Sequence, residues 1–372
     1  MLDFVLQNFQ YRYVSVHDYL SMYDNPKSRM IDLMLPSMVD YDFWIAKGRA
    51  TPTSLASQVD VMEAISVATG GRVHAFVPFD PLKQVALELD KGNADPFKLV
   101  AEAIETRGCV GVKLYPPMGF AAYGNTSLPS GFWNRKWLPS WVNDPETGKR
   151  LDDAMLKMLR WCETNEVPVM AHTGISNGPS DDFQQLAGAQ YWSKALDKVP
   201  GLRVSFGHFG DSSLGSEDST GSAHALGFMA LMGDGPQAKG RHAFADAGYF
   251  VEGISQQPRL LAALRDLYEV TTAGQASLST RFMYGTDWEM TLAEGNVIDT
   301  YLDRFVELFK EMQKRPAVLS QGLSRLDDRF FGLNAATWIG LRRGERARSR
   351  LDAFYAKHKV STPDWMTKLD KV

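Results

Sequence analysis

Residues 167–174 read VPVMAHTG, and residues 202–210 read LRVSFGHFG. Each stretch is an apolar run that ends in a histidine, His172 or His208, and the histidine is followed by one residue and then a glycine. Runs that are apolar throughout, without alternation, are typical of strands buried on both faces. Five further runs have the same character, near 31–39, 73–79, 109–115, 248–254 and 281–287.

Helical patterns separate these runs, so the sequence predicts a parallel sheet built from βαβ units. Several runs end in a residue that can bind or tune a metal, and the carboxyl ends of barrel strands share one face. This placement favours an α/β fold of the (β/α)8 barrel type over a doubly wound sheet. We expect one domain over residues 1–372, with a helical segment over 1–25 and a C-terminal helical extension over 342–372.

The composition is that of an ordinary globular protein, with 44% apolar and 23% charged residues. A formal net charge of −4 gives no reason to expect nucleic acid or an anionic membrane as a partner. No apolar run approaches the ~18 residues that indicate a membrane span. The two cysteines, Cys109 and Cys162, are expected to be buried thiols, which favours a reducing compartment and a cytoplasmic location.

The polar residues at four strand ends form the candidate site: Lys113 in GVKLYPP, His172, His208, and Asp287 in YGTDW. Imidazole nitrogen and carboxylate oxygen are ligands that zinc prefers, and an Asp beside a metal-bound water can accept its proton. The pattern predicts one or two divalent ions, with zinc first among them. Each residue could also be structural. For Lys113 three interpretations remain open: a carboxylated ligand, a partner for a substrate carboxylate, and a structural ion pair.

A long loop from Gly119 to Arg150 is rich in aromatic residues and follows the run that carries Lys113. An apolar wall with a few basic groups suits a small-molecule acid. The alternative is that these aromatics only close the loop on the barrel. The predicted pocket residues are Tyr115, Phe120, Trp133, Arg135 and Trp288. His74, in the middle of RVHAFVPF, is expected to be packed and not catalytic.

The chain resembles the amidohydrolase superfamily, in particular the amidohydrolase-related branch that includes aminocarboxymuconate-semialdehyde-decarboxylase-like proteins. The motifs occur in family order across residues 30–341: FVPFDP, GVKLYPPMGF, VPVMAHTG, VSFGHFGD, YGTDW and FFGLNAATWIGL. The resemblance implies a metal ligand at His172 and a ligand or water-positioning group at His208. It implies a ligand and catalytic base at Asp287, and at Lys113 the position that some relatives carboxylate to bridge two metals.

One departure from the family pattern affects the site. Family members open with a strand that ends in His-x-His, whereas this sequence contains no His-x-His. The run near 31–39 resembles the family's second strand, and residues 1–25 resemble the helical segment before it. We therefore expect that Met1 is an internal methionine and that strand 1 is missing from this chain. Natural loss of the strand is the alternative.

The function predicted from these residues is metal-dependent hydrolysis of a C–N or C–O bond in an amide, lactone or ester of a small substrate, which can itself carry a carboxylate. Two alternatives remain. One is a metal-dependent non-oxidative decarboxylase of the same branch. The other is a catalytically impaired barrel, because the His-x-His is absent. Relatives often form oligomers, so a homo-oligomer is also among the expectations.

Overall fold

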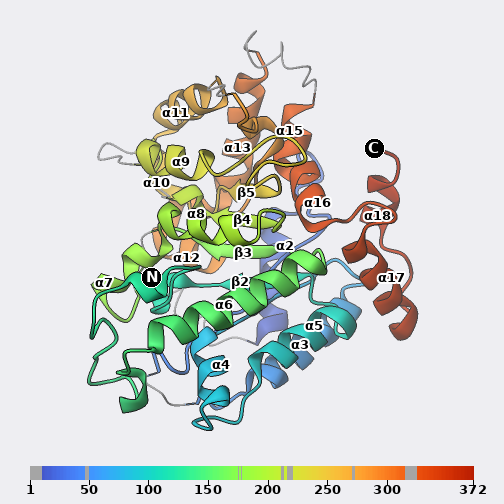
Figure 1. Ribbon diagram of the computed structural model, residues 1–372. Helices are drawn as coiled ribbons and strands as arrows, with labels where there is room; N and C mark the ends of the chain where they lie inside the picture. The colour runs from blue at the N-terminus through green and yellow to red at the C-terminus, as the bar shows by residue number, and fades with distance from the viewer. Residues whose placement is uncertain are drawn as a thin grey trace.

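The computed structural model describes residues 11–46, 50–174, 176, 178–210, 213–215, 221–269, 273–314 and 325–372. In this part of the chain a parallel sheet runs through the centre, with helices packed around it (Figure 1). The strands pair in the order in which they occur in the sequence. They are β1 (Phe76–Pro78), β2 (Gly111–Leu114), β3 (Val169–His172), β4 (Val204–Gly207), β5 (Ala243–Asp246) and β6 (Phe282–Met283).

The predicted α/β fold with a parallel sheet is confirmed, and a sequential strand order is the order of a barrel. The register pairs Pro78 with Lys113 and His172 with Gly207. Residues of the first predicted run continue the sheet beyond β1, because Met34 and Ser37 form parallel bridges with Val73 and Phe76.

The strand predicted over 248–254 is wrong. The structure places β5 earlier, at Ala243–Asp246, and a helix, α10 (Val251–Ser255), within the predicted range. A short apolar run does not by itself distinguish a strand from a buried helical turn. Here Glu252 lies in the first turn of the helix, where a negative charge is favourable, and Val251 and Ile254 are buried on one side.

Helices follow the strands and cover the sheet. The longer ones are amphipathic: in α6, for example, Leu151, Met155, Met158 and Cys162 recur at three- and four-residue steps and are all buried. The other helices are α2 (Arg12–Tyr23), α3 (Leu55–Ala68), α4 (Pro81–Glu88), α5 (Pro96–Thr106), α6 itself (Thr147–Thr164), α7 (Asp181–Gln184), α8 (Ala189–Lys198), α9 (Gly221–Met229), α11 (Gln257–Glu269), α12 (Trp288–Thr291), α13 (Tyr301–Met312), α15 (Leu326–Asp328), α16 (Asn334–Ile339), α17 (Arg346–His358) and α18 (Asp364–Leu369). None of the described helices has the length and apolarity needed to cross a membrane.

The C-terminal helices cover the amino-terminal end of the sheet, at the right of Figure 1. The Trp338 ring stacks on Phe76 with centroids 5.3 Å apart, and the Trp365 indole donates a hydrogen bond to Gly71 O at 2.9 Å. His74, which is fully buried, joins this end to α17. Its Nδ1 lies 2.7 Å from Gly108 O and its Nε2 lies 2.7 Å from the Tyr355 hydroxyl.

These partners make His74 a pH-dependent contributor to stability. A carbonyl only accepts, so Nδ1 carries the proton and Nε2 accepts from Tyr355. Burial lowers the pKa of His74 to about 4, below the ~6.5 of an unfolded chain. The unfolded state therefore binds the proton first, and the contribution of His74 is present above pH ~6.5 and is lost as the pH falls toward 4.

We expect the stability difference between wild type and His74→Gln to shrink by about 3 kcal/mol between pH 7 and pH 4. Urea unfolding at a series of pH values measures it. Burial also lowers the pKa of His242 to about 4. Because His242 is present in both proteins, its contribution cancels in the difference between their free energies of unfolding. A stability difference that stays constant over this range would contradict the assignment.

No strand closes the sheet between β6 and residues 34–37 in the part of the chain that the structure describes. Backbone groups in and next to β6 form hydrogen bonds with residues of the C-terminal segment instead. Tyr284 N donates to Phe330 O at 2.9 Å, and the Asn334 amide donates to Phe282 O at 2.8 Å. Helix α2 packs alongside. Its Tyr19 ring meets Trp288 edge-on at 5.6 Å, and its Tyr23 hydroxyl donates to Ile298 O at 3.2 Å.

Candidate active site

The carboxyl edge of the sheet carries most of the backbone strain of the described residues. Non-glycine residues with positive φ cost roughly 1–3 kcal/mol each and cluster at functional sites. Three of them, Asp90, Glu166 and Lys359, come just after the ends of helices, where this conformation is usual. The other four follow β4, β5 and β6: His208, Phe209, Tyr249 and Asp287. Two of the predicted site residues, His208 and Asp287, are therefore among the strained residues at this edge.

Two of the predicted site residues, His172 at the end of β3 and His208 just after β4, are in direct contact. Their ring centroids lie 4.5 Å apart, and His172 Nδ1 lies 3.0 Å from His208 Nε2. Both rings are buried. Thr173 holds the two strand ends together, because its hydroxyl donates to Gly207 O at 2.6 Å and accepts from Gly210 N at 3.0 Å.

The far nitrogen of each ring determines which nitrogen carries the proton. His172 Nε2 lies 3.1 Å from Gly174 O, and His208 Nδ1 lies 2.9 Å from Gly248 O. Since carbonyls only accept, these two nitrogens carry the protons. When both rings are neutral and donate to these carbonyls, the two nitrogens that face each other both present lone pairs, an arrangement that a cation bound between them would stabilise.

A proton shared between His172 Nδ1 and His208 Nε2 would be one such cation, but protonation of this buried pair is unfavourable. Burial lowers the pKa of His172 well below its usual value, and the electrostatic influence of the neighbouring His208 ring and of the Lys113 amine acts in the same direction. A divalent metal fits better. Metal-bound histidines usually donate their second N–H to a carbonyl or carboxylate, as both rings do here. Two nitrogens about 2.0–2.1 Å from a tetrahedral zinc lie ~3.3 Å apart, close to the observed separation.

The histidines supply only two ligands. Among the described residues, no three His, Cys, Asp or Glu side chains gather closely enough to hold a metal. Asp287 lies at the same edge, after β6, but is not grouped with the histidines as a third ligand. The residues present thus fit part of a metal site.

Lys113 is buried in β2, with 8% of its surface exposed. Its amine makes no hydrogen bond or ion pair with any residue that the structure describes, and it lies 6.0 Å from the centre of the Tyr115 ring. Burial lowers the pKa of the amine, and the charges of Asp287 and Asp246 partly oppose this effect. The structural ion pair, one of the three interpretations, is absent from the described residues.

Asp287 is exposed and is the N-cap residue of α12. Its backbone has φ of 52° and ψ of 48°, and its carbonyl accepts from the amides of Met290 and Thr291. Its carboxylate has no hydrogen-bond partner among the described side chains. Its negative charge nevertheless acts to raise the pKa of the Lys113 amine and of the Tyr115 hydroxyl. The carboxylate is therefore available to a ligand or a water at this edge.

Asp246, at the end of β5, is the site residue that the sequence analysis missed. Its Oδ1 accepts from His208 N at 3.2 Å and from Gly248 N at 3.1 Å, and its Oδ2 accepts from the Ser205 hydroxyl at 3.0 Å. Asp246 thus fixes the backbone on both sides of the His208 ring. The sequence HAFAD, residues 242–246, is an apolar run that ends in an acidic residue, like the other strand ends of the site. The strand was predicted over 248–254 instead, so Asp246 was not considered.

Two predicted pocket residues lie beside the histidines and Asp287. Tyr115 stacks on His172 with centroids 4.3 Å apart, and its hydroxyl lies 2.5 Å from Ser176 Oγ. Trp288, next to Asp287, is 8% exposed, and its buried indole nitrogen has no acceptor among the residues that the structure describes. The Tyr115 ring therefore lies against the histidine pair, whereas the Trp288 ring packs edge-on against Tyr19 of α2.

The other three predicted pocket residues have structural partners. Phe120 is 2% exposed and packs near Trp44, and the Trp133 indole donates to Gly119 O at 2.7 Å. Arg135 forms an ion pair with Asp182 of α7 at 2.6 Å. These contacts favour the alternative in which the aromatics close the loop on the barrel.

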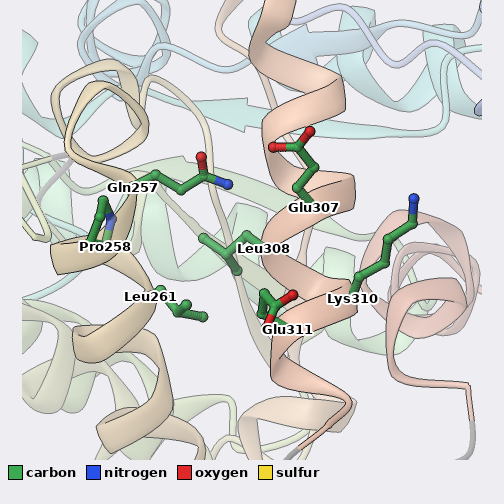
Figure 2. Close-up of a pocket in the computed structure, with 7 residues that line it drawn as sticks. All are labelled: Gln257, Pro258, Leu261, Glu307, Leu308, Lys310 and Glu311. Atoms are coloured by element: carbon green, nitrogen blue, oxygen red, sulfur yellow. The ribbon is translucent and has the colours of Figure 1, made fainter.

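A groove elsewhere on the surface has a volume of about 390 Å³. Figure 2 shows that Glu307, Leu308, Lys310 and Glu311 line it from one helix, and that Gln257, Pro258 and Leu261 line it from another. These helices are α13 and α11, so none of the strand-end residues contributes to this groove. It does not belong to the candidate active site.

No family model matches the sequence, and no curated protein matches it significantly. Solved structures share part of its shape. One is a probable 2-pyrone-4,6-dicarboxylic acid hydrolase from Acinetobacter baumannii with bound citric acid. It is 15% identical, with coverage of 87% of this chain and 88% of that chain and a TM-score of 0.46.

Two further structures are similar at a lower level. An amidohydrolase from Burkholderia multivorans with bound zinc is 12% identical, with 83% of each chain covered and a TM-score of 0.42. A 5-carboxyvanillate decarboxylase from Sphingomonas paucimobilis is 13% identical, with 83% of this chain and 79% of that chain covered and a TM-score of 0.42.

Proposed function

We propose that this chain is a metal-dependent hydrolase of the amidohydrolase type, acting on a C–N or C–O bond of a small substrate. The observation that supports this most directly is the buried contact of His172 Nδ1 with His208 Nε2, 3.0 Å apart, in which the second nitrogen of each ring faces a backbone carbonyl. A buried pair of this kind is stable when a cation is bound between the two nitrogens. Zinc is the ion we expect, since it prefers imidazole nitrogen.

The two histidines would hold the metal, and the carbonyls of Gly174 and Gly248 keep their rings oriented. When bound, a divalent metal lowers the pKa of a coordinated water toward ~7 and polarises a carbonyl group. Asp246 holds His208 in place through the backbone amides on either side of the ring.

Asp287 is proposed as the general base. Its exposed carboxylate has no described side-chain partner, so it can accept a proton from water and deliver it to the leaving group. Lys113 is proposed to bind an anionic oxygen of the substrate, because no described residue places a counter-charge within ion-pair distance of its buried amine. A carboxylated amide, lactone or ester meets both conditions.

The test is a substrate panel with purified protein and added zinc. It contains carboxylated lactones, esters and amides, together with aromatic carboxylic acids. We expect zinc-dependent acid release from at least one ester, lactone or amide, and loss of that activity in His208→Gln. Release of carbon dioxide from an aromatic acid without hydrolysis would instead assign the decarboxylase. An absence of turnover across the panel in wild-type protein that binds zinc would contradict both, and would favour the catalytically impaired barrel.

A further inference from the structure

The amino-terminal edge of the sheet, opposite the histidine pair, carries a group of basic residues. Arg203 precedes β4, Arg241 and His242 precede β5, and Arg281 precedes β6. We call these four residues the amino-terminal basic cluster. Strand pairing brings them together, because Val204 N donates to His242 O at 3.1 Å and Ala245 N donates to Arg281 O at 2.9 Å.

The charges of this cluster are only partly compensated. Arg203 lies 3.4 Å from a Glu345 carboxylate oxygen and 3.7 Å from one of Glu166. Arg241 donates to a carbonyl, that of Pro236, at 2.7 Å. Among the described residues, no carboxylate lies within ion-pair distance of Arg241.

Arg281 is the least satisfied member of the cluster. Its guanidinium makes no hydrogen bond or ion pair with any residue that the structure describes, and it lies 5.0 Å from the centre of the Phe244 ring. Its buried Nε–H has no acceptor within the described part of the chain, and leaving a buried donor unpaired costs free energy. The Asp234 carboxylate influences Arg281 electrostatically but is not within ion-pair distance.

His242 shows the effect of these positive charges on a neighbour. Burial and, to a lesser extent, the positive charges of Arg203, Arg241 and Arg281 together lower its pKa to about 4. The local potential is therefore positive, although the whole chain has a formal net charge of −4. Attraction of an anion to this edge would thus be a local property and not a result of overall charge.

We propose that the amino-terminal basic cluster binds a small multivalent oxyanion of the phosphate type. The planar guanidinium group matches the geometry of such an anion, and a dianion compensates two charges within one site. The site lies at the opposite end of the sheet from His172 and His208, so the anion is not the substrate of the proposed reaction.

The first experiment titrates wild-type protein with inorganic phosphate and follows thermal unfolding, with sodium chloride at matched ionic strength as the reference. We expect phosphate, and not chloride, to raise Tm by roughly 2 °C at saturation. Arg281→Gln should weaken phosphate binding roughly tenfold or more. The matched control is Arg343→Gln, since Arg343 is 82% exposed and pairs with Asp370 at the surface. It should bind phosphate like wild type.

A second measurement does not depend on the folding of a variant. Bound phosphate stabilises the imidazolium form, so the pKa of His242, followed by NMR in wild-type protein, should rise from about 4 when phosphate is added. An unchanged His242 pKa, or a Tm increase that chloride reproduces, would overturn the proposal. So would phosphate binding that is equal in wild type and in Arg281→Gln.

Discussion

Replacing Asp287 with asparagine is expected to lower kcat by roughly a thousandfold while zinc binding changes by only a few-fold. General base catalysis contributes on the order of 10²–10⁴ to rate, and an amide cannot accept the proton. Asparagine is the appropriate replacement because residue 287 has a φ of 52°, a conformation that asparagine tolerates. Steady-state kinetics on the substrate found in the panel, together with a zinc titration, measures both quantities.

The matched control is Asp303→Asn, which makes the same chemical change at an exposed position of α13. It should keep wild-type kcat. If Asp287→Asn loses less than roughly tenfold in kcat, Asp287 is not the base. If it loses zinc binding entirely, Asp287 is mainly a ligand, and the division of roles proposed above is wrong.

Lys113→Met is expected to have opposite effects on stability and on activity. Methionine fits the volume of the lysine stem and removes a buried amine without a partner, so the free energy of unfolding should rise by about 1 kcal/mol. Substrate binding should weaken, with KM rising roughly tenfold to a hundredfold for a carboxylated substrate, because the counter-charge is lost. Urea unfolding and steady-state kinetics measure the two effects.

Lys83→Met is the informative comparison. The Lys83 amine is also largely buried, but it lies 2.6 Å from carboxylate oxygens of Asp40 and of Asp42. Removing it leaves those carboxylates unpaired and should destabilise the fold by about 3 kcal/mol. A Lys113→Met variant that is destabilised as strongly as Lys83→Met would show that Lys113 has a structural role.

The sequence predicted those parts of the fold in which burial alone determines the pattern. VPVMAHTG and LRVSFGHFG form β3 and β4 because apolar runs between helices have few alternatives to a buried strand. The pattern around β5 was ambiguous, since HAFAD and YFVEGIS are both apolar runs of similar length. The strand forms from the first and the helix from the second, and Asp246 was missed for that reason.

The sequence indicated which residues lie at the candidate site, but not which atoms those residues contact. The positions of His172 and His208 follow from strand ends that share one edge. Their facing nitrogens depend on two backbone carbonyls, those of Gly174 and Gly248, which no sequence pattern indicates. The partners of Arg135 and Trp133 likewise depend on how the long loop folds back on itself.

His172 and His208 are proposed to bind a divalent metal together, and a calorimetric zinc titration measures this binding. The titration compares wild type, His172→Gln, His208→Gln and the control His17→Gln, whose side chain is 77% exposed on α2. We predict that wild type and His17→Gln bind zinc with equal affinity, and that each of the other two variants binds it roughly a hundredfold more weakly. Zinc binding that is unchanged in His172→Gln and His208→Gln, or absent from wild type, would contradict the account.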